Sequence, residues 1–135
     1  MEKVKLTRTG DAPLAFDGEV AAEATGDVHG GEELTRWHDL SLYRMASGRY
    51  VVAIDYLTRW QGESAHSSAQ VCQSTEDVQR LLRDYDPAQF AVRCRELNDR
   101  SRDSNERMVA QLRSVYEHRV SRLLSDVDDL VEHVS

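Results

Sequence analysis

The stretch WHDLSLYRMASGRYVVAIDYLTRW, residues 37–60, decides the fold. Polar and apolar residues alternate on both sides of Ala46–Gly48, and a period of two is typical of β-strands. The glycine of this short connection suits the left-handed backbone position of a hairpin turn. We therefore predict two antiparallel strands joined at Ala46–Gly48. We expect the second strand to lie inside a sheet, because both of its faces are partly apolar.

Three further segments have strand patterns. Lys3–Arg8 and Ala69–Cys72 are short, whereas Leu14–Ala24 is longer and has apolar or small residues at its even positions. We expect a bulge in that longer strand at Gly18. The polar segment Thr25–Glu33 contains three glycines and is predicted to be a loop.

A short helix is predicted after the last strand. Ser74 is a good N-cap, and Asp77 stands three residues later, as in a variant of the capping box. Asp86 precedes Pro87, and a residue before proline avoids the helical region. The apolar positions form one stripe, which consists of Val78, Leu81, Leu82 and Tyr85. Residues 1–87 are thus predicted to form an α+β domain, an antiparallel sheet of about five strands with one packed helix.

The rest of the chain is predicted to be a long helical C-terminal arm. Residues 88–103 are expected to form a short helix and a charged linker, with a break at Ser101–Ser104. We expect Asp103 and Glu106 to cap a second helix over residues 104–135. Such a helix spans roughly 45 Å, whereas a body of about 90 residues has a radius of gyration of only about 12 Å. The arm is therefore expected to overhang the sheet.

An apolar stripe with spacings of three and four residues follows this arm, as is typical of a helix that packs against a partner. The stripe comprises Val109, Leu112, Tyr116, Val120, Leu123, Val127, Leu130 and Val134. The valines and leucines of its second half favour parallel pairing, whereas early arginines and late acids favour antiparallel pairing. We expect this helix interface to join copies of the chain or to dock it on a larger complex. Folding back onto the chain's own sheet is the alternative.

Charge and composition narrow the classes of partner. The formal net charge is −7, which opposes binding to a nucleic-acid backbone. No apolar run approaches the roughly 18 residues of a membrane span, and the first residues lack the apolar core of a signal peptide. The two cysteines, Cys72 and Cys94, form no CxxC pair, although a single disulfide between them remains open. We expect a cytoplasmic protein without membrane contact.

The opening stretch also concentrates residue types that are common in protein-binding hot spots. The candidate binding surface consists of Trp37, His38, Tyr43, Tyr56, Arg59 and Trp60. Ordinary packing between neighbouring strands is the alternative explanation for these side chains.

The sequence thus favours a non-enzymatic protein-interaction or assembly module. No catalytic motif, metal-ligand spacing or cofactor motif is present, so we predict no catalytic residue, metal or cofactor. Stacking of single-stranded nucleic acid on the aromatic rings is disfavoured by the acids nearby.

Two other classes of function remain as alternatives. An acidic inhibitor or accessory regulator of a nucleic-acid-processing machine, of the phage–host conflict type, would use a negative strand face formed by Asp17, Glu19 and Glu23. A small metal-dependent enzyme would use the region of His29, His38 and His66.

Overall fold

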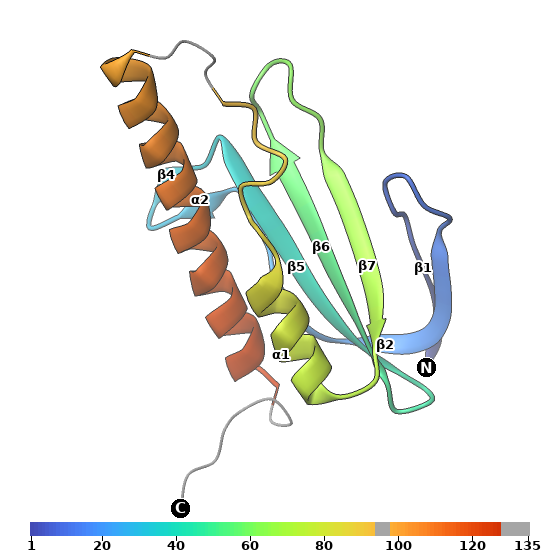
Figure 1. Ribbon diagram of the computed structural model, residues 1–135. Coiled ribbons are helices and arrows are strands. Elements are labelled where there is room, and N and C mark those ends of the chain that lie inside the picture. The colour runs from blue at the N-terminus through green and yellow to red at the C-terminus, as the bar shows by residue number, and fades with distance from the viewer. Residues whose placement is uncertain (94–97, 128–135) are drawn as a thin grey trace, which may run out of the picture.

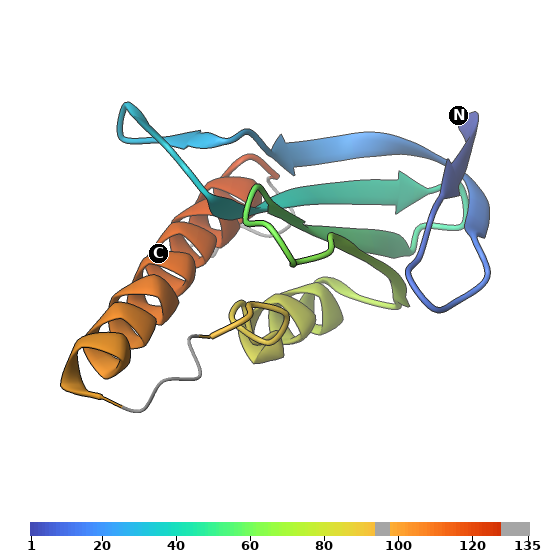
Figure 2. The same ribbon diagram turned by 90° about the horizontal axis from the view of Figure 1, so that it is seen from above.

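The computed structural model describes residues 1–93 and 98–127. Within these residues it has a five-stranded antiparallel sheet, a two-stranded ribbon and two helices, which confirms the α+β prediction. The strands are β1 (Glu2–Leu6), β2 (Leu14–Ala24), β3 (Val28–His29), β4 (Glu32–Glu33), β5 (Arg36–Met45), β6 (Tyr50–Thr58) and β7 (His66–Cys72), and the helices are α1 (Thr75–Asp84) and α2 (Asp99–Ser125). Both helices lie on the same side of the sheet (Figures 1 and 2).

The predicted hairpin is the centre of the sheet. The strand order is β1-β2-β5-β6-β7, so β5 and β6 both have neighbours on each side. The turn lies at Ala46–Gly48 as predicted, and Gly48 has a φ of +89°, which disfavours other residues there. The predicted loop after β2 contains the small β3–β4 ribbon. Each of its strands has only two residues, which is too short for an alternating pattern to be detected in the sequence. β1 and β7 form the two edges of the sheet.

The strand β2 contains a bulge, but not at Gly18 as predicted. The register shifts between Val20 and Ala22, which pair with consecutive residues of β5 and leave Ala21 as the extra residue. An extra residue reverses the alternation of side chains beyond it. Phe16 therefore packs in one core and Ala22 in the other, although both positions are even.

Gly18 serves a different purpose, which is close packing against β5. A Cβ atom at this position would lie 2.5 Å from the Arg44 carbonyl oxygen and 2.9 Å from the Phe16 ring. The nearer atom belongs to the backbone of the paired strand β5, so a side chain at residue 18 would force the two strands apart.

The sheet has a hydrophobic core on each face. The core beneath the helices is larger and contains Ala22, Ala24, Leu40, Leu42, Tyr50, Val52, Ile54, Cys72, Val78, Leu82, Tyr116, Leu123 and Val127. The core on the opposite face is formed by Phe16, Val51, Ala53 and Ala69, with Val4, Leu6, Leu14, Tyr43, Met45 and Val71 packed around them. Figure 2 shows the sheet curling at the end where β1 lies, which lets the β1–β2 hairpin cover this second core.

The helix α1 begins where the sequence predicts. The Ser74 side chain accepts a hydrogen bond of 3.2 Å from the Asp77 backbone N–H, which satisfies one open donor of the first turn. Val78 and Leu82 are fully buried against the sheet. The Tyr116 hydroxyl donates a 2.5 Å hydrogen bond to the Leu82 carbonyl, so α1 and α2 are also linked directly.

The helix α2 begins earlier than predicted. Asn98 caps it by accepting a 2.9 Å hydrogen bond from Ser101 N–H, and the Ser101 hydroxyl accepts one of 3.2 Å from Asn98 N–H. This reciprocal capping box uses serine where glutamate is usual, and the helix runs unbroken through Ser101–Ser104. The predicted break there, with a new cap at Asp103, is therefore wrong.

The apolar stripe of α2 packs largely against the chain's own sheet, which is the alternative arrangement considered above. Leu112, Tyr116, Leu123 and Val127 are buried, Val109 and Val120 are partly buried, and Leu130 and Val134 lie outside the described residues. Pairing with a second chain stays a prediction, but most of the stripe is already covered.

A buried arginine fixes α2 to the sheet. Arg119 is 5% exposed and donates a 2.7 Å hydrogen bond to the His38 carbonyl of β5. It also donates to the Gly26 carbonyl and lies 3.6 Å from the Asp39 carboxylate. One guanidinium thus joins the middle of α2, the strand β5 and the turn after β2.

We predict that Leu123→Ala lowers the stability of the single chain. Leu123 is fully buried, so truncation removes packing and leaves a cavity, at a cost of about 2–5 kcal/mol. Urea denaturation measures the change, with the exposed Gln111→Ala as the control on the same helix. Because the contact lies within one chain, the unfolding midpoint should not change with protein concentration. A midpoint that rises with concentration would show that the stripe joins chains.

Candidate functional site

The six residues of the predicted binding surface do not form one surface. Trp37 and His38 are consecutive in β5 and therefore point to opposite faces of the sheet. His38 and Tyr56 face the helices and are 1% and 0% exposed. Tyr43 lies on the other face, where its ring meets Phe16 edge-on at 5.5 Å. Packing therefore accounts for His38, Tyr43 and Tyr56.

The remaining three predicted residues gather at the outer end of the hairpin. The Arg59 guanidinium lies 5.4 Å from the centre of the Trp37 ring and forms an ion pair with Asp27. Trp60 follows β6 and is 53% exposed, with the Arg36 guanidinium 4.9 Å from its ring centre. Each tryptophan therefore lies beside an arginine from the other half of the hairpin. Trp37 of β5 lies beside Arg59, and Trp60 lies beside Arg36 of β5.

A buried carboxylate that the sequence analysis did not predict, that of Glu63, lies nearby. Its side chain has no exposed area and receives hydrogen bonds from Arg36 Nη2 at 2.6 Å, Tyr56 Oη at 2.6 Å and Val92 N–H at 3.0 Å. Burial alone would raise the pKa of Glu63, but these donors, with Thr58, outweigh burial and lower the pKa to about 2. Glu63 is therefore ionised at neutral pH.

The Glu63 network fixes the segment that follows α1. Val92 is tied to Glu63, and Phe90 stacks on His66 with ring centres 3.8 Å apart and planes 18° apart. Phe90 also lies 6.1 Å from the Tyr56 ring. The residues after α1 therefore return to the start of β7 and close one end of the space between α1 and the sheet.

His38 is a structural residue. Its ring centre lies 5.3 Å from Tyr56, 5.5 Å from Tyr85 and 5.3 Å from Tyr116. Burial, aided by the positive charge of Arg119, lowers the pKa of His38 to about 4, so the ring is neutral at pH 7.

The histidines of the metal hypothesis have separate surroundings. His29 of β3 lies beside His118 of α2 with ring centres 5.1 Å apart, and His66 is stacked on Phe90. Within residues 1–93 and 98–127, no three histidine, cysteine, aspartate or glutamate side chains are grouped as metal ligands. The metal hypothesis therefore gains no support from this part of the chain.

The negative strand face of the regulator hypothesis is divided by the bulge in β2. Asp17 and Glu19 precede the bulge and lie opposite Lys3 and Arg44 in the register. Glu23 follows the bulge and therefore points to the other face. The three acids do not form the continuous ridge that the uninterrupted alternation predicted.

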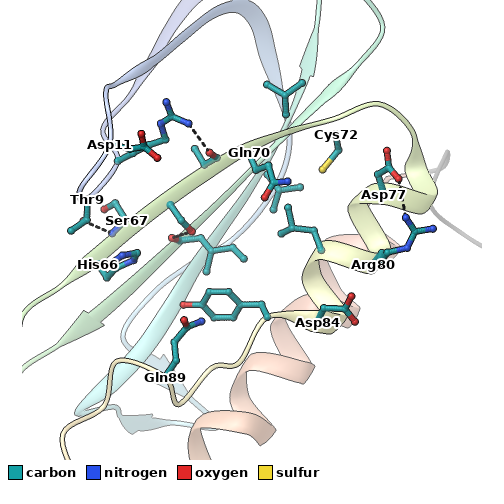
Figure 3. A pocket seen from close by; sticks show the side chains of 18 of the residues that line it. Thr9, Asp11, His66, Ser67, Gln70, Cys72, Asp77, Arg80, Asp84 and Gln89 are labelled. Atoms are coloured by element: carbon teal, nitrogen blue, oxygen red, sulfur yellow. Dashed lines mark hydrogen bonds and ion pairs between the residues drawn. The ribbon is translucent and has the colours of Figure 1, made fainter.

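The structure reveals a groove that the sequence did not indicate, between β7 and α1. Its volume is about 930 Å³, and it is open to solvent. Figure 3 shows Gln70 of β7 in its middle, with Asp77, Arg80 and Asp84 of α1 along one side and Thr9 and Ser67 on the other. Its apolar lining includes Val52, Ile54, Ala69, Val71, Leu81 and Phe90.

Two polar atoms in the lining of this groove are buried without a hydrogen-bond partner among the described residues. They are the Tyr85 hydroxyl and the Nδ1 atom of His66. Such atoms are uncommon in folded proteins, because an unsatisfied polar group costs about 1–3 kcal/mol.

The edge of β7 borders the groove and is only partly covered. Thr9 N–H donates to the Ser67 carbonyl at 2.8 Å, and Ser67 N–H donates to the Thr9 hydroxyl at 2.9 Å. Arg8 reaches the Ala69 carbonyl at 3.5 Å. Backbone groups of alternate residues point to the same side of a strand, so those of Ser67, Ala69 and Val71 all point away from β6.

Comparisons with known proteins add no family to this description. No protein-family model, no curated protein and no solved structure matches the chain. Over the described ranges, neither helix has the length and apolar character needed to cross a bilayer.

We predict that Glu63→Gln destabilises the fold by about 3–5 kcal/mol, because Arg36 would lose its charged partner while it remains mostly buried. The lowered pKa of Glu63 stabilises the protein fully above the unfolded-state pKa of about 4.3, and this contribution disappears as the pH falls towards 2. The wild type should therefore lose more stability between pH 7 and pH 3.5 than the variant does. Urea denaturation at both pH values measures this.

The matched control is Glu33→Gln. The Glu33 side chain is 80% exposed and lies 3.5 Å from Arg59, so its ion pair contributes less than about 1 kcal/mol. Equal effects of the two substitutions would contradict a special role for Glu63.

Proposed function

We propose that this protein is a non-enzymatic protein-interaction module that binds a segment of its partner in the groove between β7 and α1. The observation that carries the proposal is the position of this groove along a sheet edge whose backbone is only partly covered. Grooves of this kind bind peptides through main-chain hydrogen bonds and side-chain pockets.

The walls of the groove support the proposal because each is held by contacts outside it. The floor belongs to β6 and β7. Val78 and Leu82 anchor α1 to the sheet, and Tyr116 of α2 binds the end of α1. Glu63 holds the end wall through Val92. A site that is formed before binding loses little conformational entropy when the ligand arrives.

The lining also fits a protein segment better than a compact small molecule. Apolar side chains such as Ile54 and Leu81 lie beside charged ones such as Arg80 and Asp84. Small-molecule sites generally enclose most of the ligand, whereas this groove is open to solvent. An elongated ligand would cover the apolar floor and keep polar groups in water.

Assembly through α2 remains a second, separate prediction. The exposed residues of α2 carry both signs of charge, with Arg107, Arg113 and Arg122 among the basic ones and Asp103 and Glu117 among the acidic ones. Because the apolar stripe is mostly buried, contact through α2 would have to use this charged side of the helix.

The test of the proposed function is selection of ligands from a random nine-residue peptide library displayed on phage, with the full chain immobilised through a terminal tag. We expect enriched peptides whose affinity falls about tenfold or more for Gln70→Trp, because the exposed Gln70 lies in the groove and an indole there fills it. The measurement is fluorescence anisotropy with labelled synthetic peptides.

The matched control is Gln111→Trp, which adds the same exposed ring on α2, away from the groove. It should leave the affinity unchanged. Selection that enriches no peptide, or peptides that bind Gln70→Trp as well as the wild type, would reject the groove as the binding site.

A further inference from the structure

We infer that the ligand of this groove is an extended, basic segment that adds to the sheet as a strand beside β7, through the backbone groups of Ala69 and Val71. This inference rests on the proposed function, because it specifies how the groove is used. Strand addition supplies affinity through main-chain hydrogen bonds, and alternate side chains then provide specificity.

The chain itself already pairs with the first part of this edge. Thr9 N–H and its hydroxyl bind both backbone groups of Ser67, and Arg8 takes the Ala69 carbonyl. The contact ends there. Within residues 1–93 and 98–127, the N–H of Ala69 and both backbone groups of Val71 have no hydrogen-bond partner. An added segment would continue the same row of hydrogen bonds towards Cys72.

The position of α1 determines where the side chains of such a segment point. An added strand lies about 4.8 Å from β7, and its side chains alternate between the two faces of the sheet. Those on the helix side would meet Leu81 and Asp84 of α1. Those on the other side would extend the core that contains Ala69 and Val71. Apolar residues are therefore accommodated on both faces, next to a charged helix.

The charges of the groove favour a basic ligand. Its charged lining comprises Arg8, Arg80, Asp11, Asp77 and Asp84, which is one more acid than base. Arg80 lies 3.4 Å from Asp77 and is partly neutralised by it. The chain as a whole carries a net charge of −7, which raises the encounter rate with cationic segments.

The two edges of the sheet differ in a way that favours β7. The short strand β1 carries Glu2, Lys3 and Lys5, and charges on an edge discourage further pairing. The strand β7 has the sequence HSSAQVC, without lysine, arginine, aspartate or glutamate. A second copy of β7 fits less well than a peptide, because Thr9 and Arg8 cover part of the edge and would leave only a few residues for antiparallel pairing.

The first test compares Val71→Pro with Val71→Ala, using the synthetic form of the most enriched library peptide as the probe. Proline removes the outward N–H of Val71 and keeps the ladder to β6, because that N–H does not face β6. We expect Val71→Pro to lower the affinity about tenfold or more and Val71→Ala, which keeps the N–H, to change it less than about threefold. Thermal unfolding establishes that both variants are folded.

The second test leaves the protein unchanged and so does not depend on a folded variant. Single N-methyl groups are placed at each position of the same peptide in turn. Strand addition predicts the largest loss of affinity at the position whose N–H meets the Val71 carbonyl, and tolerance at the two neighbouring positions, since only alternate N–H groups of the peptide face β7. Uniform tolerance of N-methylation would overturn strand addition.

The outcomes separate the inference from the proposed function. One outcome is that peptides bind the wild type but not Gln70→Trp, with an affinity that neither Val71→Pro nor N-methylation changes. In that case the groove binds protein segments, but not as an added strand. If the enriched peptides are acidic, the proposed ligand charge is wrong. If no peptide is enriched, the proposed function itself fails.

Discussion

The buried carboxylate of Glu63 is the constraint on which the groove depends. An isolated charge in the interior costs several kcal/mol, so Glu63 is tolerable only with its donors in place. Those donors come from β5, β6 and the segment after α1, namely Arg36, Tyr56 and Val92. The network therefore forces that segment back to the sheet and sets Phe90 against His66 at the end of the groove. A local electrostatic requirement thus shapes a surface several residues away.

The bulge in β2 has an equally wide effect, because it lets one sheet serve two cores. Residues before it pack under the curled β1–β2 hairpin, and residues after it pack under the helices. Arg119 and Leu123 of α2 then hold this helix over β5, while the shorter α1 lies near β6 and β7. This division covers most of the two central strands and leaves the β7 edge only partly covered.

The sequence predicted the elements better than their assembly. Alternation and turn chemistry located the hairpin at Gly48, and Ser74 with Asp77 located the start of α1. The bulge was misplaced because a glycine is a common but indirect signal, and the real bulge residue, Ala21, has no distinguishing chemistry. The cap of α2 was missed because Ser101 takes the position usually held by glutamate or glutamine.

Of the predicted surface, Trp37, Arg59 and Trp60 lie near the hairpin end. Strand alternation places His38 and Tyr56 on one face, but it could not show that the helices cover that face. The groove joins residues 8–11, β7, α1 and residue 90, and such long-range proximity leaves no periodic trace in a single sequence.

The most direct measurement of the central claim is amide hydrogen exchange by NMR, on the full chain with and without a saturating peptide from the library. Strand addition predicts new protection of the Ala69 and Val71 amides, which point away from β6. The amides of Ser68 and Gln70 point towards β6 and serve as internal controls, so their protection should stay as it is. Equal protection along all four residues, or protection confined to the Trp60 end of the sheet, would contradict the account.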